Sequence, residues 1–248
     1  FLTHVDRTIS DSFCHADIGP YDTKAGRIIL ELSAQMQRPV PNMSLIYNGH
    51  TTDDFACMAI ETGLVTAKPS FVNDAMYTAD WGPDYAIVSC YNALPIGGGG
   101  LTLGRLNMRA LGEAAGGREH FLNELLPAAV AAQCEQMDKR DTYIFEEARF
   151  LENTFLSQEG LIHKDRFVGM FGLVGLAECV NTVLKLDKPE ERYGHGREAE
   201  DFALMVLDRI HDQVSAYKPR YGSFAMHGQV GISTDTGVTP NTRIPVGE

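Results

Sequence analysis

A single cysteine, Cys90, follows the short apolar run "YAIVS" and precedes the turn-like "YNALP" and four consecutive glycines, Gly97 to Gly100. The run has no polar alternation, which is typical of a parallel strand buried on both faces. Cys90 then lies at the carboxyl end of that strand, where ligands collect in α/β sheets. The glycines allow close backbone approach and leave room for another chain segment. The combination indicates a reacting thiol, whereas most free cysteines are inert buried residues.

Other catalytic and binding chemistries fit the sequence less well. No lysine follows the glycines as in a Walker loop, the GxGxxG spacing fails, and "IVSCYN" lacks the GxSxG of a serine hydrolase. A cysteine-dependent hydrolase or transferase stays open, because His163 or His227 can pair with Cys90 from a distance in the sequence. A non-catalytic α/β binding protein, with Cys90 inert, also stays open.

Composition excludes several functional classes. The 21 basic residues are outnumbered by 33 acidic ones, which argues against a nucleic-acid partner. The histidines form no HExxH motif or close ligand pair, and the five cysteines form no CxxC pair, so no metal is predicted and a reducing cytoplasm fits best. No apolar run approaches the roughly 20 residues of a membrane span, and the N-terminus lacks the basic-then-apolar pattern of a signal peptide. We expect a soluble cytoplasmic protein.

The first third of the chain reads as alternating helices and strands. A helix is predicted within residues 21–37, starting at Asp22 or Thr23. Its apolar residues at helical spacing are Ile28, Ile29, Leu32 and Met36. A short strand is predicted over residues 42–48, followed by a second helix over 51–64 that starts at Thr52 and closes at Gly63.

The rest of the chain continues the alternation. A strand is predicted over residues 101–108, and residues 119–153 are largely helical, with a break or turn expected at Pro127. Residues 166–186 read as a strand, a turn at Gly172 or Gly175, and a helix. The stripe of an amphipathic helix over 197–217 is Phe202, Met205, Val206, Ile210 and Val214. The pattern predicts an α/β fold with mostly parallel strands, in a single domain over residues 1–248.

Three stretches carry a family resemblance that extends over almost the whole chain. "VSCYNALPIGGGGLTLGRLN", "FVGMFGLVGLAECVN" and the terminal "DTGVTPNTRIPVGE" resemble the YjjI family of glycyl radical enzymes, relatives of formate acetyltransferase and anaerobic ribonucleotide reductase. "NMSLIYNGHTTDDFACMAIETGLVTAKPSFVND" is similar to the stretch that precedes the active-site cysteine in that group. The resemblance implies a ten-stranded β/α barrel built from two parallel half-sheets, of which this chain forms a part. The resemblance also implies a possible homodimer, because related enzymes are commonly dimers.

The resemblance also implies a reaction. Cys90 would become a thiyl radical that abstracts hydrogen from a small-molecule substrate in anaerobic metabolism, and Gly97 to Gly100 would lie near the approach of the radical loop. The stored radical would be on a glycine, placed there by an S-adenosylmethionine radical activating enzyme. A dry cavity inside the barrel would protect this chemistry from oxygen and competing hydrogen donors.

The sequence departs from the family pattern at several positions. No R-V-x-G-Y motif is present, and "HGQVGIS" around Gly228 and Gly231 lacks the arginine and the aromatic residue. We therefore expect the radical glycine downstream of Glu248, with this chain an internal fragment that is inactive alone. Asn92 stands where many eliminating members have a glutamate, and Ser89 precedes Cys90 where formate acetyltransferases have a second cysteine. Neither mechanism transfers directly.

Further site residues are predicted from their places in the pattern. Glu178 starts the helix after an apolar strand and is a candidate general base, with a capping or solvated acid as the alternative. Predicted substrate-binding residues are Asn92, Tyr91, His163, Cys179 and Arg243. Arg243 would bind an anionic group or pair with one of the abundant acids.

Overall fold

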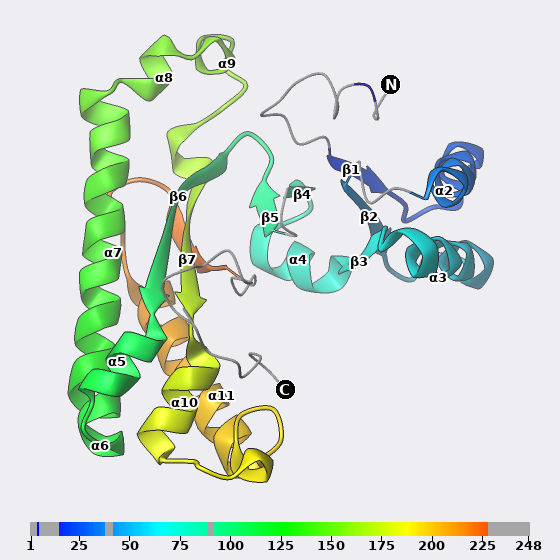
Figure 1. Ribbon diagram of the computed structural model, residues 1–248. Coiled ribbons are helices and arrows are strands. Elements are labelled where there is room, and N and C mark those ends of the chain that lie inside the picture. The colour runs from blue at the N-terminus through cyan, green and yellow to red at the C-terminus, as the bar shows by residue number, and fades with distance from the viewer. Residues whose placement is uncertain (1–3, 5–14, 38–41, 89–91, 228–248) are drawn as a thin grey trace. The chain divides into compact units, whose positions relative to one another are not determined.

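The computed structural model describes His4 and residues 15–37, 42–88 and 92–227 (Figure 1). The chain divides into two compact units, an N-terminal unit of residues Phe1–Ile96 and a C-terminal unit of residues Gly97–Glu248. Each unit has a hydrophobic core of its own. The single catalytic domain over residues 1–248 stays a prediction.

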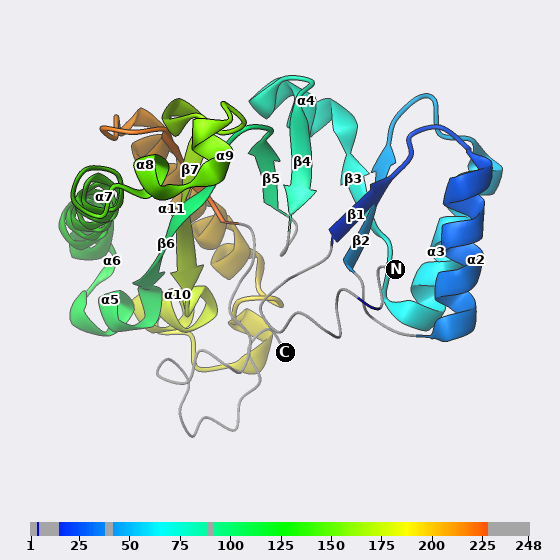
Figure 2. The same cartoon turned by 90° about the horizontal axis from the view of Figure 1, so that it is seen from above.

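The N-terminal unit contains a parallel three-stranded sheet in the order β1-β2-β3. Its strands are β1 (His15–Ile18), β2 (Asn42–Tyr47) and β3 (Ser70–Asn73), and its helices are α2 (Lys24–Met36), α3 (Asp53–Thr66) and α4 (Asp74–Trp81). Helices α2 and α3 lie side by side against the same face of the sheet (Figure 2). The core on that face is formed by Ile18, Leu30, Leu45, Phe55 and Ala59.

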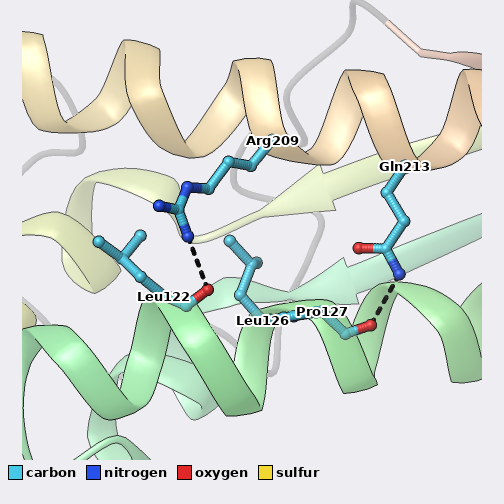
Figure 3. Close-up of a pocket in the computed structure, with 5 residues that line it drawn as sticks. All are labelled: Leu122, Leu126, Pro127, Arg209 and Gln213. Atoms are coloured by element: carbon cyan, nitrogen blue, oxygen red, sulfur yellow. Dashed lines mark hydrogen bonds between the residues drawn. The ribbon is translucent and has the colours of Figure 1, made fainter.

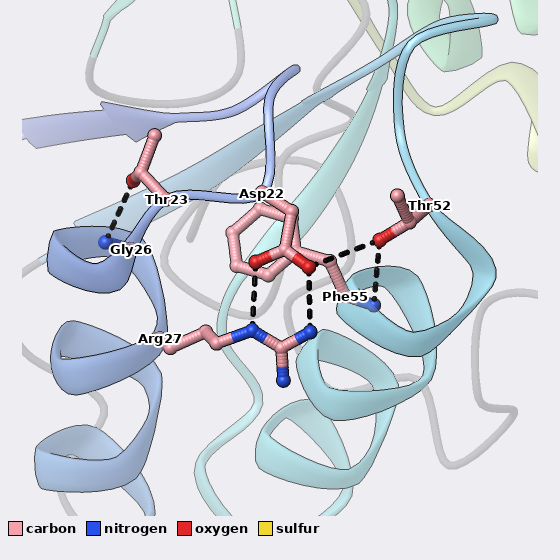
Figure 4. Close-up of polar contacts among 6 residues, drawn as sticks. All are labelled: Asp22, Thr23, Gly26, Arg27, Thr52 and Phe55. Atoms are coloured by element: carbon pink, nitrogen blue, oxygen red, sulfur yellow. Dashed lines mark hydrogen bonds and ion pairs between the residues drawn. The ribbon is translucent and has the colours of Figure 1, made fainter.

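Threonine side chains cap both of these helices, as the sequence predicts. The Thr23 hydroxyl accepts a hydrogen bond from the Gly26 N–H at 3.0 Å, and the Thr52 hydroxyl accepts one from the Phe55 N–H at 3.3 Å (Figure 4). Each bond satisfies a backbone donor that the first helical turn leaves unpaired. Helix α3 continues past Gly63, because Ala67 takes the left-handed cap position and donates its N–H to the Gly63 carbonyl.

One carboxylate connects the starts of the two helices. Asp22 accepts hydrogen bonds from Arg27 Nε at 2.7 Å and from the Thr52 hydroxyl at 3.2 Å (Figure 4). The Arg27 guanidinium is the main reason why the pKa of Asp22 lies below its usual value. Asp22 was one of two candidates for the first N-cap, and it bridges the helices while Thr23 caps α2.

Helix α2 packs through a face that its apolar spacing indicates only in part, because Ile29 is the member of the predicted stripe that packs against the core. Leu30 is fully buried, and a Cβ atom at Gly26 would lie 2.8 Å from Cζ of Phe55. The missing side chain at Gly26 therefore lets the Phe55 ring of α3 reach the helix backbone. The apolar residues on the outer side of α2 are Ile28, Leu32 and Met36, with 43%, 49% and 41% of their surface exposed.

The stretch around Cys90 forms an antiparallel pair of strands and not the predicted parallel strand followed by a turn. Strand β4 (Tyr85–Val88) pairs with β5 (Asn92–Pro95), and the last pair in register is Val88 with Asn92. Only Ile87 of β4 is buried. A hairpin needs no crossover helix between its strands, which explains why two strands lie so close together in the sequence.

The C-terminal unit contains a second parallel three-stranded sheet in the order β6-β7-β8. Its strands are β6 (Gly99–Asn107), β7 (Phe167–Val174) and β8 (Ser223–Met226). Helix α7 runs along β6 and β7 (Figure 1). The longer helices are α5 (Met108–Ala114), α7 (Leu126–Thr142), α10 (Leu176–Leu184) and α11 (Arg197–Ala216). The short helical segments are α6 (Arg118–His120), η1 (Phe121–Leu125), η2 (Tyr143–Glu147), α8 (Phe150–Asn153), α9 (Phe155–Gln158), η3 (Lys164–Arg166) and η4 (Pro189–Glu191).

Most predicted elements of this unit are confirmed. Strand β7 leads through Gly175, whose φ of 78° is left-handed, into α10. Helix α11 buries Phe202, Val206, Ile210 and Val214 of its predicted stripe, and Met205 is half-buried. Pro127 does not break the helical stretch, because it stands in the first turn of α7, where a proline is tolerated.

The hydroxyl of Thr102 in β6 is buried without a hydrogen-bond partner among the described residues, and its removal can be tested. Thr102 is 3% exposed, and its Oγ1 has no hydrogen-bond partner among the described residues. An unpaired buried hydroxyl is unfavourable, so Thr102→Val should raise the free energy of unfolding by about 1 kcal/mol. Thr66→Val is the contrasting variant, because the Thr66 hydroxyl donates to the Lys68 carbonyl at 2.7 Å and its loss should destabilise the protein. Urea denaturation measures the free energy of unfolding of both variants. A Thr102→Val variant less stable than the wild type would show that the Thr102 hydroxyl is not buried without a partner.

Candidate functional site

In the sequence, Cys90 falls between strands β4 and β5, which pair with each other. Val88 and Asn92 are paired neighbours across the β4–β5 ladder. Cys90 and Tyr91 fall between them in the sequence and outside the described residues. The pairing of these flanks is antiparallel, where the sequence pattern predicts a single parallel strand before Cys90.

The hairpin packs against the face of the sheet that α2 and α3 leave open. Val72 of β3, Ile87 of β4 and Ala93 of β5 form a small buried cluster, and Ile46 of β2 packs against it. Because side chains alternate along a strand, Ile46 lies on the opposite face from Leu45, which belongs to the core under α2 and α3. Apolar contacts thus pack the hairpin against the face of the sheet opposite α2 and α3.

A hydrogen-bonded carboxylate fixes the start of β4. Asp74, at the start of α4, accepts hydrogen bonds from the Tyr85 hydroxyl at 2.7 Å and from Asn48 Nδ2 at 2.8 Å. These bonds, with Asn48 as the largest cause, hold the pKa of Asp74 below its usual value. Burial and the neighbouring Asp74 raise the pKa of Tyr85, so the phenol stays a hydrogen-bond donor at physiological pH.

A second carboxylate contacts the middle of β4. Asp17 of β1 accepts a hydrogen bond through Oδ2 from the Ile87 N–H at 3.1 Å, and its Oδ1 lies 3.5 Å from Nε2 of His15. Nε2 of His15 also lies 2.9 Å from the hydroxyl oxygen of Ser44. Burial raises the pKa of Asp17, against the lowering effects of the Ile87 N–H and of His15.

The sheet register explains why these three polar residues meet. Asp17 pairs with Ser44 across β1 and β2, and His15 is two residues before Asp17, so all three side chains emerge on the hairpin side of the sheet. No local pattern in the sequence indicates this cluster, because His15 and Ser44 are 29 positions apart and belong to no motif. Only the pairing of β1 with β2 brings them together.

The C-terminal unit brings two predicted site features together. The Gly97 carbonyl accepts a hydrogen bond from the His163 N–H at 2.8 Å, and the His163 side chain is exposed. Gly97 has a φ of +85°, a left-handed conformation that favours glycine. The roles of His163 in substrate binding and of Gly97 to Gly100 near a radical loop stay predictions.

Gly98 is the glycine that leaves the least room for a side chain in this stretch. A Cβ atom at Gly98 would lie 1.8 Å from the backbone oxygen of Arg166, whereas one at Gly99 would lie 3.4 Å from Cε1 of Phe167. Gly98→Ala should therefore force β6 and η3 apart and lower the free energy of unfolding by about 3 kcal/mol. Gly99→Ala is the matched control and should change it far less. Equal denaturation midpoints for the two variants would contradict the close approach.

Glu178 and Cys179 lie in the first turn of α10. Oε2 of Glu178 is buried and has no hydrogen-bond partner among the described residues. Cys179 is fully buried in the core, where a Cβ atom at Gly112 of α5 would lie 2.9 Å from its Cα. Burial raises the pKa of the Cys179 thiol to about 12, so this cysteine is a neutral thiol at physiological pH. Catalysis by Glu178 and substrate binding by Cys179 stay predictions.

The other predicted residues fall partly outside the described chain. Arg243, Gly228 and Gly231 lie outside the described residues, as do Cys90 and Tyr91, and for Asn92 only the backbone is described. His227, the alternative partner of Cys90 in a hydrolase, is buried just after β8, and its N–H donates to the Phe171 carbonyl at 2.8 Å.

A cavity of about 250 Å³ in the C-terminal unit is lined by residues that hydrogen-bond to one another. It lies between α11 and the π-helical turn η1, lined by Leu122, Leu126, Pro127, Arg209 and Gln213 (Figure 3). In a π-helix the N–H of residue 127 would bond the carbonyl of Leu122, but Pro127 has no N–H. Arg209 Nη1 donates to that carbonyl instead at 2.9 Å, and Gln213 donates to the Pro127 carbonyl at 2.8 Å.

Two properties of the described residues bear on other functions. Within the described ranges, no helix has the length and apolar character that crossing a bilayer requires. Among the same residues, His, Cys, Asp and Glu side chains form no group of three that is suited to a metal ion.

The chain is similar in sequence to two bacterial proteins. It is 40% identical over 257 residues to a protein from Haemophilus influenzae and 36% identical over 256 residues to YjjI from Escherichia coli. Both alignments cover 100% of this chain, but only 50% and 49% of the relatives. The chain therefore spans about half the length of the curated relatives that it matches.

Solved structures establish the fold, and a family model establishes the family. The B12-independent glycerol dehydratase from Clostridium butyricum matches 86% of this chain, over 38% of its own length, with a TM-score of 0.63 and 14% identity. The anaerobic ribonucleotide reductase from Thermotoga maritima matches 82%, over 38% of its own length, with a TM-score of 0.61 and 17% identity. The two parallel sheets thus form part of the α/β barrel of glycyl radical enzymes. The model described as "Glycyl radical enzyme YjjI-like" matches residues 1–248, and the chain belongs to this family.

Proposed function

We propose that this chain is the part of a glycyl radical enzyme that carries the hydrogen-abstracting cysteine, Cys90. The observation that carries the proposal is the antiparallel pairing of β4 with β5, the two strands that flank Cys90 in the sequence, in a chain that belongs to the family. A hairpin tip can reach into an enclosed cavity while the strands behind it remain packed on a sheet. Cys179, which is buried in a core, lacks such a presentation.

The chemistry begins with two hydrogen-atom transfers. The Cys90 S–H bond breaks and its hydrogen atom moves to a glycyl Cα radical, which leaves a thiyl radical and an intact glycine. The thiyl radical then takes a hydrogen atom from a C–H bond of a small-molecule substrate, which restores the thiol and leaves a substrate radical. The glycyl radical is delocalised over its peptide groups and can be stored, whereas the thiyl radical is reactive enough to attack the substrate.

The proposal assigns roles to groups beyond the described hairpin. The radical glycine lies downstream of Glu248, and an S-adenosylmethionine radical enzyme generates the radical under anaerobic conditions. Glu178 serves as a general base, and Asn92, Tyr91, His163 and Arg243 contact the substrate. The enzyme works in the cytoplasm, as a homodimer.

Electron paramagnetic resonance of the full-length protein tests this function without a known substrate. After anaerobic activation, the remaining α-hydrogen of a glycyl radical splits its signal into a doublet. In D₂O the Cys90 thiol becomes S–D, and reversible transfer places deuterium on the glycine, so the doublet should collapse to a single line. Absence of any glycyl signal after activation by the cognate activase would contradict the proposal.

A further inference from the structure

We propose that Asp17 is the positioning residue for Cys90, because its carboxylate holds the free edge of β4 at Ile87, three residues before the cysteine. This inference rests on the proposed function of Cys90. It assigns no contact between Asp17 and the reacting atoms, and it concerns only where the hairpin holds its tip.

The hydrogen-bond pattern of the hairpin gives the direction of the Ile87 N–H. The Ile96 N–H donates to the Asp84 carbonyl at 2.9 Å. Because hydrogen-bonded pairs alternate in an antiparallel ladder, the pair of Ile87 with Ala93 is a non-hydrogen-bonded one. Pro95, which has no N–H, occupies the equivalent position opposite Tyr85. The Ile87 N–H therefore points away from β5, toward the unpaired edge of β4.

The Asp17 carboxylate takes the place of a neighbouring strand at this edge. Among the described residues, β1 does not pair with β4, yet Oδ2 of Asp17 accepts the Ile87 N–H at 3.1 Å across 70 positions of sequence. Ile87 is 2% exposed, so its N–H has no access to water and requires this acceptor. A bond from a backbone donor to a charged acceptor is stronger than one to a neutral oxygen.

The carboxylate is itself oriented by its neighbours on the sheet. Nε2 of His15 lies 3.5 Å from Oδ1 of Asp17 and 2.9 Å from the Ser44 hydroxyl oxygen. A second hydrogen bond, from the Tyr85 hydroxyl to Asp74, holds the start of β4 two residues before Ile87. Asp17 is thus the polar contact nearest in sequence to Cys90 among those that bind β4 to other elements of the described unit.

Amide hydrogen exchange of the full-length protein tests the contact itself. Asp17→Ala should speed exchange of the Ile87 amide about 10-fold, as expected for the loss of one charged hydrogen bond, with exchange in α11 unchanged. Asp17→Asn retains an acceptor oxygen and should restore most of the protection. Thr52→Ala is the matched control, because it removes the cap of α3 in the same unit without touching the hairpin. Unchanged protection in Asp17→Ala, or loss of its cooperative unfolding altogether, overturns the proposal.

The deuterium collapse of the glycyl doublet tests the consequence for Cys90. Asp17→Ala should form as much glycyl radical as the wild type but exchange it at least about 10-fold more slowly, and Asp17→Asn should recover most of the rate. Wild-type exchange in Asp17→Ala overturns the positioning role alone. Exchange at the wild-type rate in Cys90→Ala instead overturns the proposed function, so the two failures are distinguishable.

Discussion

Cys90→Ala is expected to retain the glycyl radical signal while losing all exchange with deuterium and all turnover. The methyl group of alanine has a C–H bond far stronger than the S–H bond of cysteine, so the glycyl radical cannot pass its unpaired electron to residue 90. If the proposed activating enzyme places the radical directly on the glycine, radical formation should not require this thiol. The measurement is the glycyl doublet in H₂O and D₂O, with the spin concentration determined on the same samples.

Cys57→Ala is the matched control for that experiment. Cys57 lies in α3 and is exposed, so its loss tests whether any accessible thiol can relay the radical. The variant should show the same doublet collapse as the wild type. A Cys90→Ala protein that still exchanges deuterium, or a Cys57→Ala protein that does not, would assign the relay to another residue.

Asp141→Asn is expected to remove a large pH dependence from the stability of the protein. Asp141 of α7 is 1% exposed, and neither carboxylate oxygen has a hydrogen-bond partner among the described residues. Burial, with a smaller effect from the charge of Asp138, raises the pKa of Asp141 to about 7 from its ordinary value of 3.8. The native state therefore holds this proton more tightly than the unfolded state does.

The sign of the effect follows from that difference. The contribution of Asp141 to the free energy of unfolding is fully present below its unfolded-state pKa of 3.8 and is lost as the pH rises through its folded-state pKa of about 7. At 1.36 kcal/mol per pKa unit, the total loss is about 4 kcal/mol. Asparagine cannot ionise, so the free energy of unfolding of the variant should rise relative to that of the wild type as the pH increases from about 4 to about 8. Urea denaturation across this range measures the gain, with exposed Asp208→Asn as the control. Parallel stability profiles for Asp141→Asn and the wild type would show that Asp141 is not buried as a neutral acid.

The helices were predictable because their signals are local. Thr23 and Thr52 begin α2 and α3, and both act through hydrogen bonds to residues three positions later. The stripe of α11 is similarly encoded within one segment. The packing face of α2 was predictable only in part from its own apolar spacing, because the choice depends on the Phe55 ring of another helix meeting Gly26.

The short strands and the polar cluster depend on pairing between distant segments. Strands β1, β3 and β8 have four residues each, too few for a periodic signal to stand out from the chain around them. Strand β5 ends in Pro95, a residue that indicates a turn in a single sequence but is tolerated at a strand edge. The meeting of His15, Asp17 and Ser44 follows from the register of β1 on β2, which no local pattern contains.

The π-helical turns at both ends of α7 have a consequence for how related sequences align. A π-helical turn holds about one residue more than an α-helical turn, and one residue corresponds to about 100° of rotation around the axis. Deleting a single residue within η1 would restore regular winding and turn every upstream side chain of that helix, Phe121 included, away from the Phe202 ring that it now contacts. A one-residue gap at positions 121–125 of a homologue therefore marks a change in which side chains face α11, and not a change in loop length.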